Sequence, residues 1–458
     1  MRSQGLSVFR LLLILVVLGV LAPAGWFLFT RLEGAPPEVR LEPDPTALGI
    51  ARDIEVSVAD EGSGLRFVRV ILSAGGKDET LFEESFGGSA LAGSGDRPDT
   101  KIQVQIEPRK LGLADGNGIL RIEAADYSWR RWWNGNLAEI ERPVVIDTTP
   151  PQVAVITTSH YINQGGAGLV AFKVSEDCPR LGVVVGDHFY PAHSGFFKAA
   201  DVYSAFFAVA FNQGSNTPVM ISATDAAGNE TTAVFNYRIR AKQFRSDNLN
   251  ISDRFIETHL KGVFQTDGAN SSNKDLFLHV NRIIRKTNYD TLTGVGTQSE
   301  TTKHWDGAFL RLPNSAPKAG FADHRVYFYQ GEEIDRQVHL GADLASIAQS
   351  PVPAANHGRV VFAGSVGIYG NTVILDHGFG LMSTYSHLSE IHVQPGDTVR
   401  KDDVIGRTGA TGLAAGDHLH FGVLVHDTFV NPVEWWDAGW VRDNIDLKIQ
   451  QVESRVGS

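Results

Sequence analysis

Cysteine is nearly absent from this chain, because Cys178 is the only one among its 458 residues. A single thiol excludes any disulfide bond within the chain, so packing and metal binding have to hold the fold instead. We expect Cys178 to be a small buried residue on a strand, where a free cysteine behaves as an apolar side chain.

Positive charge is also scarce. The chain has 41 lysines and arginines against 52 aspartates and glutamates, which gives a formal net charge of -11. Surfaces that bind nucleic acid are basic, so this balance argues against a nucleic-acid partner. With 43% hydrophobic and 20% charged residues, the chain can bury ordinary cores, and its length predicts about three domains.

Charged residues are missing from Leu11–Phe29, whereas Arg2 and Arg10 precede this apolar run and Arg31 follows it. The run is about as long as a helix needs to be to cross a bilayer, and basic residues before it favour a cytoplasmic N-terminus. We therefore expect residues 1–31 to be a single-pass anchor in the inner (cytoplasmic) membrane. The rest of the chain then lies on the periplasmic or extracytoplasmic side.

A cleaved signal peptide is the alternative interpretation of the same run. Ala22-Pro23-Ala24 has the small residues that are typical of a cleavage site. The anchor is favoured, because the apolar run continues through Trp26 and ends at Phe29 in aromatic residues typical of a membrane interface. Either interpretation exports the protein.

Two segments of short, alternating strands follow the apolar run. Each opens on a proline pair, Pro36-Pro37 or Pro150-Pro151, and continues in runs such as Ile54 to Val58. Alternation over short runs, separated by glycine, aspartate and asparagine, predicts antiparallel β-sandwiches. We expect immunoglobulin-like β-sandwiches at residues 35–148 and 149–241, related by internal duplication.

The second segment ends with the turn Asp225-Ala226-Ala227-Gly228-Asn229 and a last strand predicted from Thr232 to Tyr237. The turn resembles those of bacterial immunoglobulin-like domains of cell-surface proteins. Such sandwiches serve as spacers or bind wall polymer or a protein partner. The first segment contains an unusual cluster of tryptophans and arginines. Three interpretations remain: it stacks on sugar rings, it docks a partner, or it packs at a domain interface. Its residues are Trp129, Arg130, Arg131, Trp132 and Trp133.

Residues 242–308 change to a helical pattern. Ser252 or Asp253 precedes one apolar stripe, and a second stripe runs from Leu276 to Ile284. We expect a short helical linker that docks on the C-terminal domain or on a partner protein. Its place just before that domain also leads to a hypothesis of autoinhibition, in which residues 243–315 cover the functional groove.

The residues with the most distinctive chemistry lie near the C-terminus. His339 and Asp343 have the spacing H-x-x-x-D, and His418 and His420 have the spacing H-x-H. Side chains two residues apart on a strand share a face, so His418 and His420 line one pocket wall while Leu419 faces a core. A catalytic zinc site needs three protein ligands and an open position for water. This set of residues therefore indicates a metallohydrolase.

Six short motifs occur in order along residues 321–436. They are Phe321-Ala322-Asp323-His324-Arg325, His339-Leu340-Gly341-Ala342-Asp343, Tyr369-Gly370-Asn371-Thr372-Val373-Ile374, Tyr385-Ser386-His387-Leu388, Gly406-Arg407-Thr408-Gly409-Ala410-Thr411-Gly412 and His418-Leu419-His420-Phe421. Together they resemble the motifs of the lysostaphin-like (LytM-type) zinc endopeptidases, which cut peptidoglycan cross-links. The resemblance implies an antiparallel β-sheet metallopeptidase domain at residues 309–440, followed by a tail at 441–458.

The resemblance also implies a role for each matching residue. His339, Asp343 and His420 correspond to the zinc ligands of the family, and His387 and His418 to its two catalytic histidines. Members of the family hydrolyse a peptide bond with a zinc-activated water. Their unligated histidines move protons or hold the oxyanion of the tetrahedral intermediate.

The sequence thus predicts a mainly β protein with an N-terminal transmembrane helix, two sandwiches, a helical linker and a zinc peptidase domain. Its expected function is that of a membrane-anchored metalloendopeptidase with Zn2+ as cofactor and peptidoglycan peptide stems as substrate. The alternative is a non-enzymatic wall or division scaffold that activates another hydrolase, although the retained zinc ligands favour the enzyme. Gly422 stands where the family usually has glutamate, which we expect to alter support of the ligands or substrate preference.

Overall fold

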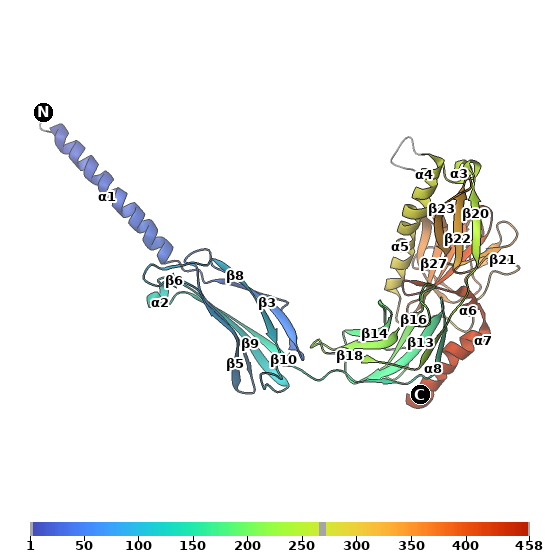
Figure 1. The fold of residues 1–458 in the computed structure, drawn as a ribbon, viewed down its shortest axis with the longest axis horizontal. Coiled ribbons are helices and arrows are strands. Elements are labelled where there is room, and N and C mark those ends of the chain that lie inside the picture. Colours follow the sequence, from blue (N-terminus) through green and yellow to red (C-terminus); the bar gives the residue numbers. More distant parts are fainter. Residues whose placement is uncertain (1–2, 265–271, 457–458) are drawn as a thin grey trace. The chain divides into compact units, whose positions relative to one another are not determined.

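The structure is a computed structural model that describes residues 3–264 and 272–456. The chain forms two compact units, one of residues 1–151 and 224–230 and the other of residues 152–223 and 231–458. Strands predominate in both units (Figure 1), so the predicted mainly β class is confirmed. The domain boundaries given above remain predictions.

The first unit opens with one long helix. α1 (Ser3–Arg31) contains a stretch of 20 residues from Arg10 to Phe29 that is long and apolar enough to cross a membrane. None of its residues is buried inside the described structure. A helix that is apolar on all sides belongs in a core or in a membrane. The predicted N-terminal apolar helix is therefore confirmed.

Two sheets form the sandwich of the first unit, and their strands follow the predicted alternation. In β3 (Arg52–Ala59), Ile54, Val56 and Val58 are buried in the core between the sheets, because alternate residues of a strand face opposite sides. The sheet orders are β1-β3-β8 and β2-β10-β9-β4-β5. The remaining bounds are β1 (Glu38–Glu42), β2 (Ala47–Leu48), β4 (Leu65–Ala74), β5 (Lys77–Ser85), β8 (Asp99–Ile106), β9 (Gly116–Asp126) and β10 (Leu137–Ile146), with a short hairpin of β6 (Gly88–Ser89) and β7 (Ser94–Gly95) and the short helix α2 (Arg130–Trp133).

The sandwich of the second unit differs in that β13 (Ala167–Val174) is buried along almost its whole length. Both faces of this strand are covered. Val170 and Phe172 pack in the main core, while Ala171 packs with Val452 of the C-terminal helix α8 (Leu447–Val456). The other strands are β11 (Val153–Val155), β12 (His160–Asn163), β14 (Arg180–Val185), β15 (His188–Pro191), β16 (Val202–Ala208), β17 (Val219–Thr224), β18 (Glu230–Ala233) and β19 (Tyr237–Arg240).

Two local predictions for this sandwich are wrong. The last strand is divided, because β18 ends at Ala233 and β19 begins at Tyr237 to pair in parallel with β12. A parallel partner in another sheet requires the chain to leave the first sheet before it pairs again. Cys178 is half-buried and lies in the connection between β13 and β14, not on a strand.

The buried His160 of β12 gives a prediction for the pH dependence of stability. Burial and, to a smaller extent, the nearby charge of Lys448 lower its pKa to about 4. Near pH 6.5 the imidazole therefore binds a proton in the unfolded chain but stays neutral in the folded chain. The contribution of His160 to stability is complete above pH 6.5 and is lost as the pH falls toward 4. We expect His160→Gln to reduce the acid loss of unfolding free energy between pH 7.5 and 4.5 by on the order of 2 kcal/mol. Urea unfolding of residues 32–458 at both pH values measures this loss. If the variant and the unchanged protein lose the same unfolding free energy between the two pH values, the prediction is contradicted.

The predicted helical segment is present but begins after an additional strand. β20 (Ser246–Ile251) pairs in parallel with β22 (Asp323–Tyr329). α3 (Asp253–His259) then starts at Ser252, whose hydroxyl accepts a hydrogen bond from the Phe255 amide at 3.2 Å, as an N-cap residue does. A second helix runs through α4 (Asn273–Leu278), the π-helical η1 (His279–Ile284) and α5 (Arg285–Val295).

The C-terminal part is built on one large sheet and two small ones. The large sheet has the order β21-β24-β32-β28-β27-β26-β30, with β33 paired to β32, and its neighbours are antiparallel. The small sheets have the orders β20-β22-β23 and β25-β31-β29. The bounds are β21 (Ala316–Ala319), β23 (Glu332–His339), β24 (Ala342–Ala345), β25 (Pro351–Pro353), β26 (Gly358–Val366), β27 (Gly370–Gly378), β28 (Leu381–Leu388), β29 (Glu390–Ile391), β30 (Thr398–Val399), β31 (Val404–Arg407), β32 (Leu419–Val425) and β33 (Thr428–Val430).

One core joins the second sandwich to the C-terminal sheet within the second unit. Trp435 of α6 (Pro432–Trp436) is completely buried. Its ring lies 6.5 Å from that of Phe206 on β16 and 5.8 Å from that of Trp305. The chain continues as α7 (Ala438–Val441), η4 (Arg442–Asp446) and α8, so residues 441–456 are helical and pack on the sandwich.

Candidate metal centre

Three strands of the large sheet and one neighbouring strand position the predicted site residues. His339 is the last residue of β23, and Asp343 follows on β24 after a tight turn. Asp343 lies directly opposite His420 of β32 in the antiparallel register, and His420 lies opposite Ser386, the residue before His387 on β28. The pairing of strands therefore brings together side chains that are about eighty residues apart in the sequence.

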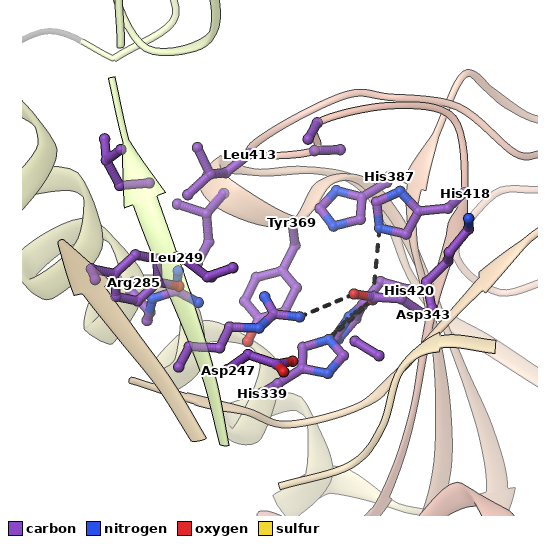
Figure 2. Close-up of a pocket in the computed structure, with 18 of the residues that line it drawn as sticks. Asp247, Leu249, Arg285, His339, Asp343, Tyr369, His387, Leu413, His418 and His420 are labelled. Carbon is purple, nitrogen blue, oxygen red and sulfur yellow. Dashed lines mark hydrogen bonds and ion pairs between the residues drawn. The ribbon is translucent and has the colours of Figure 1, made fainter. Parts of the chain in front are cut away.

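The three predicted zinc ligands converge on one point. His339 Nε2 lies 3.0 Å from Asp343 Oδ1 and 2.9 Å from His420 Nδ1, and His420 Nδ1 lies 2.8 Å from Asp343 Oδ1. All three side chains are largely buried. Figure 2 shows them directed toward one another from different strands. Two imidazole nitrogens and a carboxylate oxygen are the donor set of a zinc site.

The hydrogen bonds around these donors test whether a cation fits. His339 Nδ1 donates to the Gly320 carbonyl at 2.8 Å, which leaves Nε2 as an acceptor in the neutral ring. That acceptor faces the Asp343 carboxylate oxygen, which is also an acceptor. A metal cation satisfies facing acceptors of this kind, so the donor set fits zinc.

The two predicted catalytic histidines lie beside this cluster, with their rings 4.8 Å apart. His387 Nδ1 donates to the Thr411 carbonyl at 2.8 Å, and His418 Nδ1 donates to the Gly416 carbonyl at 2.7 Å. Each neutral ring therefore has an unprotonated Nε2. Burial, followed by the charges of His420 and His418, lowers the pKa of His387 to about 3. Both histidines line the same pocket as the three converging donors.

His418 lies just before β32 and not within it, although it shares a pocket wall with His420 as the H-x-H spacing predicts. Leu419 between them is 2% exposed and belongs to the main core. His387 has a left-handed backbone with φ of 63°. Such a conformation costs on the order of 1 kcal/mol or more in a residue other than glycine and is common at functional sites.

Arg325 lines the pocket and was missed by the sequence analysis. Its Nη2 donates to Asp343 Oδ2 at 3.1 Å, while Oδ1 of the same carboxylate faces His339 and His420. The arginine therefore fixes which carboxylate oxygen points into the cluster. Arg325 lies within a quoted motif, but no local pattern predicts its pairing with Asp343.

Removing this ion pair is expected to weaken metal binding without abolishing it. Partners that orient metal ligands typically contribute about 10- to 100-fold in affinity, so Arg325→Met should raise the dissociation constant for zinc by roughly that factor. Competition with a chromophoric chelator measures the change. Arg336→Met is the matched control, because Arg336 pairs with the exposed Glu333 on β23. An equal loss in both variants would contradict the assignment.

Gly422 has no space for the glutamate that the family usually has. A Cβ atom at this position would lie 2.6 Å from the Thr384 hydroxyl and 3.0 Å from the Phe429 ring. Both neighbours are buried side chains of adjacent strands. Thr384 and Phe429 therefore fill the space beside β32 that a glutamate at position 422 would need.

Restoring the glutamate is thus expected to harm the protein. Gly422→Glu should lower the free energy of unfolding by about 1–3 kcal/mol, because overpacking a close-packed interior forces side chains and backbone to move. Thermal or urea unfolding measures this loss. Gly416→Ala is the control, because a Cβ atom there meets nothing within 4 Å. An unchanged or higher stability of Gly422→Glu would show that β32 can adapt.

The pocket around the cluster has a volume of about 430 Å³, within the range of roughly 300–1,000 Å³ for ligand sites. Its far wall comes from the segment that precedes the C-terminal sheet, through Leu249 of β20, Phe255 of α3 and Arg285 of α5. In Figure 2 Arg285 and Leu249 lie across the pocket from the histidines, with Tyr369 between them. The segment assigned to autoinhibition therefore forms a wall of the site.

The C-terminal part defines a class of protein. Residues 337–432 match the model of peptidase family M23, and they include all five predicted site residues. The chain therefore contains a LytM-type peptidase M23 domain.

Particular relatives are similar to this chain in sequence over about a fifth of its length. The DD-carboxypeptidase/endopeptidase Mpg of Neisseria meningitidis serogroup B is 39% identical over 97 residues, which are 21% of this chain and 22% of that protein. The peptidoglycan DD-endopeptidase ShyA of Vibrio cholerae serotype O1 is 36% identical over 96 residues, with the same shares. The lysostaphin catalytic domain of Staphylococcus simulans is 28% identical with a TM-score of 0.25, covering 29% of this chain and 98% of that domain. The matched stretch thus spans about a fifth of the length of these curated relatives.

Proposed function

We propose that the protein is a membrane-anchored zinc metalloendopeptidase that hydrolyses the peptide cross-links of peptidoglycan. The observation that carries the proposal is the convergence of His339, Asp343 and His420 beside two histidines whose Nδ1 atoms donate to backbone carbonyls. The names of the relatives support wall peptides as the substrate class. The apolar helix α1, with basic residues before it, supports single-pass anchoring with the remainder exported.

In this proposal each site residue has a chemical task. His339, Asp343 and His420 hold the zinc ion. When bound there, zinc supplies a Lewis acid that polarises a carbonyl and lowers the pKa of water. Between them, His387 and His418 accept a proton of the attacking water at Nε2, return it to the leaving amine and, in the protonated form, donate to the developing oxyanion. Their Nδ1 bonds to backbone carbonyls fix the ring orientations that both tasks need.

The charges of the pocket support a peptide that carries carboxylates. Lys318 and Arg285 line the pocket, and neither forms an ion pair with an acidic side chain among the described residues. Among the side chains that the structure describes, the Arg285 guanidinium donates to the neutral Asn281 oxygen alone, at 2.7 and 3.2 Å. The guanidinium therefore keeps its charge available for a substrate anion.

A non-enzymatic scaffold that activates another wall hydrolase is the alternative. The complete set of donors, with His387 and His418 beside it, favours the enzyme, because a scaffold needs neither. Partner proteins, if any, would bind through the sandwiches or the helical segment.

The test measures zinc content and muropeptide release together on residues 32–458. This length is chosen because the core around Trp435 joins the second sandwich to the catalytic sheet. We expect about one zinc per chain and new cross-link cleavage products from purified sacculi, both lost in His420→Ala. His392→Ala is the control, since His392 contacts the exposed Glu390 outside the pocket. Bound zinc without any cleavage, together with activation of a second hydrolase, would establish the scaffold instead.

A further inference from the structure

An exposed aromatic and basic surface on the first unit has no part in the proposed hydrolysis. Trp132 is 86% exposed, Leu91 is 84% exposed and Trp133 is 47% exposed. Arg130 and Arg131 beside the tryptophans are also exposed, and neither pairs with an acidic side chain of the described residues. These five residues are called the aromatic patch.

The backbone holds the patch in an unfavourable conformation. Arg131, Trp132 and Trp133 have φ values of 48°, 56° and 64°, a left-handed region that costs on the order of 1 kcal/mol or more for each bulky residue. Arg66 secures this turn by donating to the carbonyls of Trp133 and Asn134 at 3.3 and 3.2 Å. The two tryptophans are thus held exposed on a turn whose backbone conformation is unfavourable.

Direct contacts tie the patch to the end of α1. The Trp129 amide donates to the Arg31 carbonyl at 2.7 Å, and the Trp129 ring lies 5.8 Å from that of Phe27. Arg31 also donates to the Gly93 carbonyl at 2.8 Å, two residues from Leu91. Arg130 donates to the Leu32 carbonyl at 3.0 Å. The patch is therefore adjacent in space to Phe29, where the apolar stretch ends.

We propose that the aromatic patch inserts into the lipid headgroup region of the bilayer that α1 crosses. Tryptophan favours this interface because its ring is apolar and its N–H is polar, and exposed arginines are attracted to anionic headgroups. The proposal rests on the proposed membrane anchoring of α1. Insertion would give the first sandwich a second, non-covalent attachment to the membrane and so fix its orientation there.

The test places a polarity-sensitive label at single positions of the full chain. In a Cys178→Ser background, Trp132→Cys, Leu91→Cys and Val145→Cys are labelled with NBD and reconstituted into vesicles of phosphatidylcholine and phosphatidylglycerol. Val145 is the matched control, because it is 48% exposed and lies at the opposite end of β10 from the patch. We expect the NBD emission at positions 132 and 91 to shift to shorter wavelengths and to be quenched by brominated lipids. The label at position 145 should do neither.

Resistance of the chain to carbonate extraction reports separately on α1. If the chain resists extraction but the labels at positions 132 and 145 behave alike, the patch proposal is overturned and the anchor stands. If carbonate releases the chain, anchoring fails as well, whereas the zinc and muropeptide assay on residues 32–458 is unaffected. A label at position 132 that responds to added muropeptides and not to brominated lipid would assign the patch to sugar binding and overturn the proposal.

Discussion

Replacing His387 or His418 with alanine is expected to lower kcat for cross-link cleavage by roughly 10²- to 10⁴-fold, the usual contribution of general acid–base catalysis. Zinc content should stay near one per chain, because neither residue is among the three converging donors. The double variant should lose little more than either single variant, since residues that act in one proton-transfer step are not additive. Single-turnover cleavage of a defined cross-linked muropeptide, with zinc measured on the same samples, checks both parts.

His392→Ala serves as the control for these variants, because it removes an imidazole of the same domain that lies outside the pocket. Full activity in His387→Ala or His418→Ala would remove that residue from the proposed mechanism. Loss of zinc together with activity would make it a ligand or a structural support instead. Loss of activity with zinc still bound would distinguish these two histidines from His420, whose replacement is expected to remove both.

Replacing Trp435 with alanine is expected to be the most destabilising change in the second unit. Its ring is completely buried and lies within 6.5 Å of the rings of Phe206, Trp305, Phe309 and Trp440. Large-to-small substitutions of buried aromatic residues cost about 3–5 kcal/mol, because they lose transfer energy and leave a cavity. We expect the second sandwich and the catalytic sheet to be destabilised together, as one cooperative transition.

Urea unfolding of residues 32–458 measures this effect, followed by circular dichroism and by release of zinc. Val433→Ala is the matched control on the same helix, because Val433 is 55% exposed, and substitutions of this kind usually change stability by less than about 0.5 kcal/mol. Trp435→Phe should lie between the two, since it keeps a ring and removes a buried N–H without a partner among the described residues. Separate transitions for the sandwich and the sheet would contradict the shared core.

Local sequence patterns predicted the elements well where one periodicity decides the outcome. β3 has the alternation expected from Ile54, Val56 and Val58, and the predicted cap Ser252 begins the first helix of the predicted helical segment. Prediction failed where a distant partner decides the local structure. β20 exists because β22 offers an edge nearly eighty residues away. The strand predicted from Thr232 to Tyr237 ends early at Ala233, because from Tyr237 onward the chain pairs with β12 instead.

By itself the sequence determined the apolar helix, the mainly β class and the five residues that now surround one pocket. These features follow from short-range properties: hydropathy over about twenty residues, alternation over a strand, and the spacings H-x-x-x-D and H-x-H. Only the tertiary structure decided that Arg325 orients Asp343, that β20 and α5 form a wall of the pocket, and that Trp129 joins the aromatic patch to α1. Each of these contacts joins residues far apart in the chain, and their free energies depend on packing that no local pattern records.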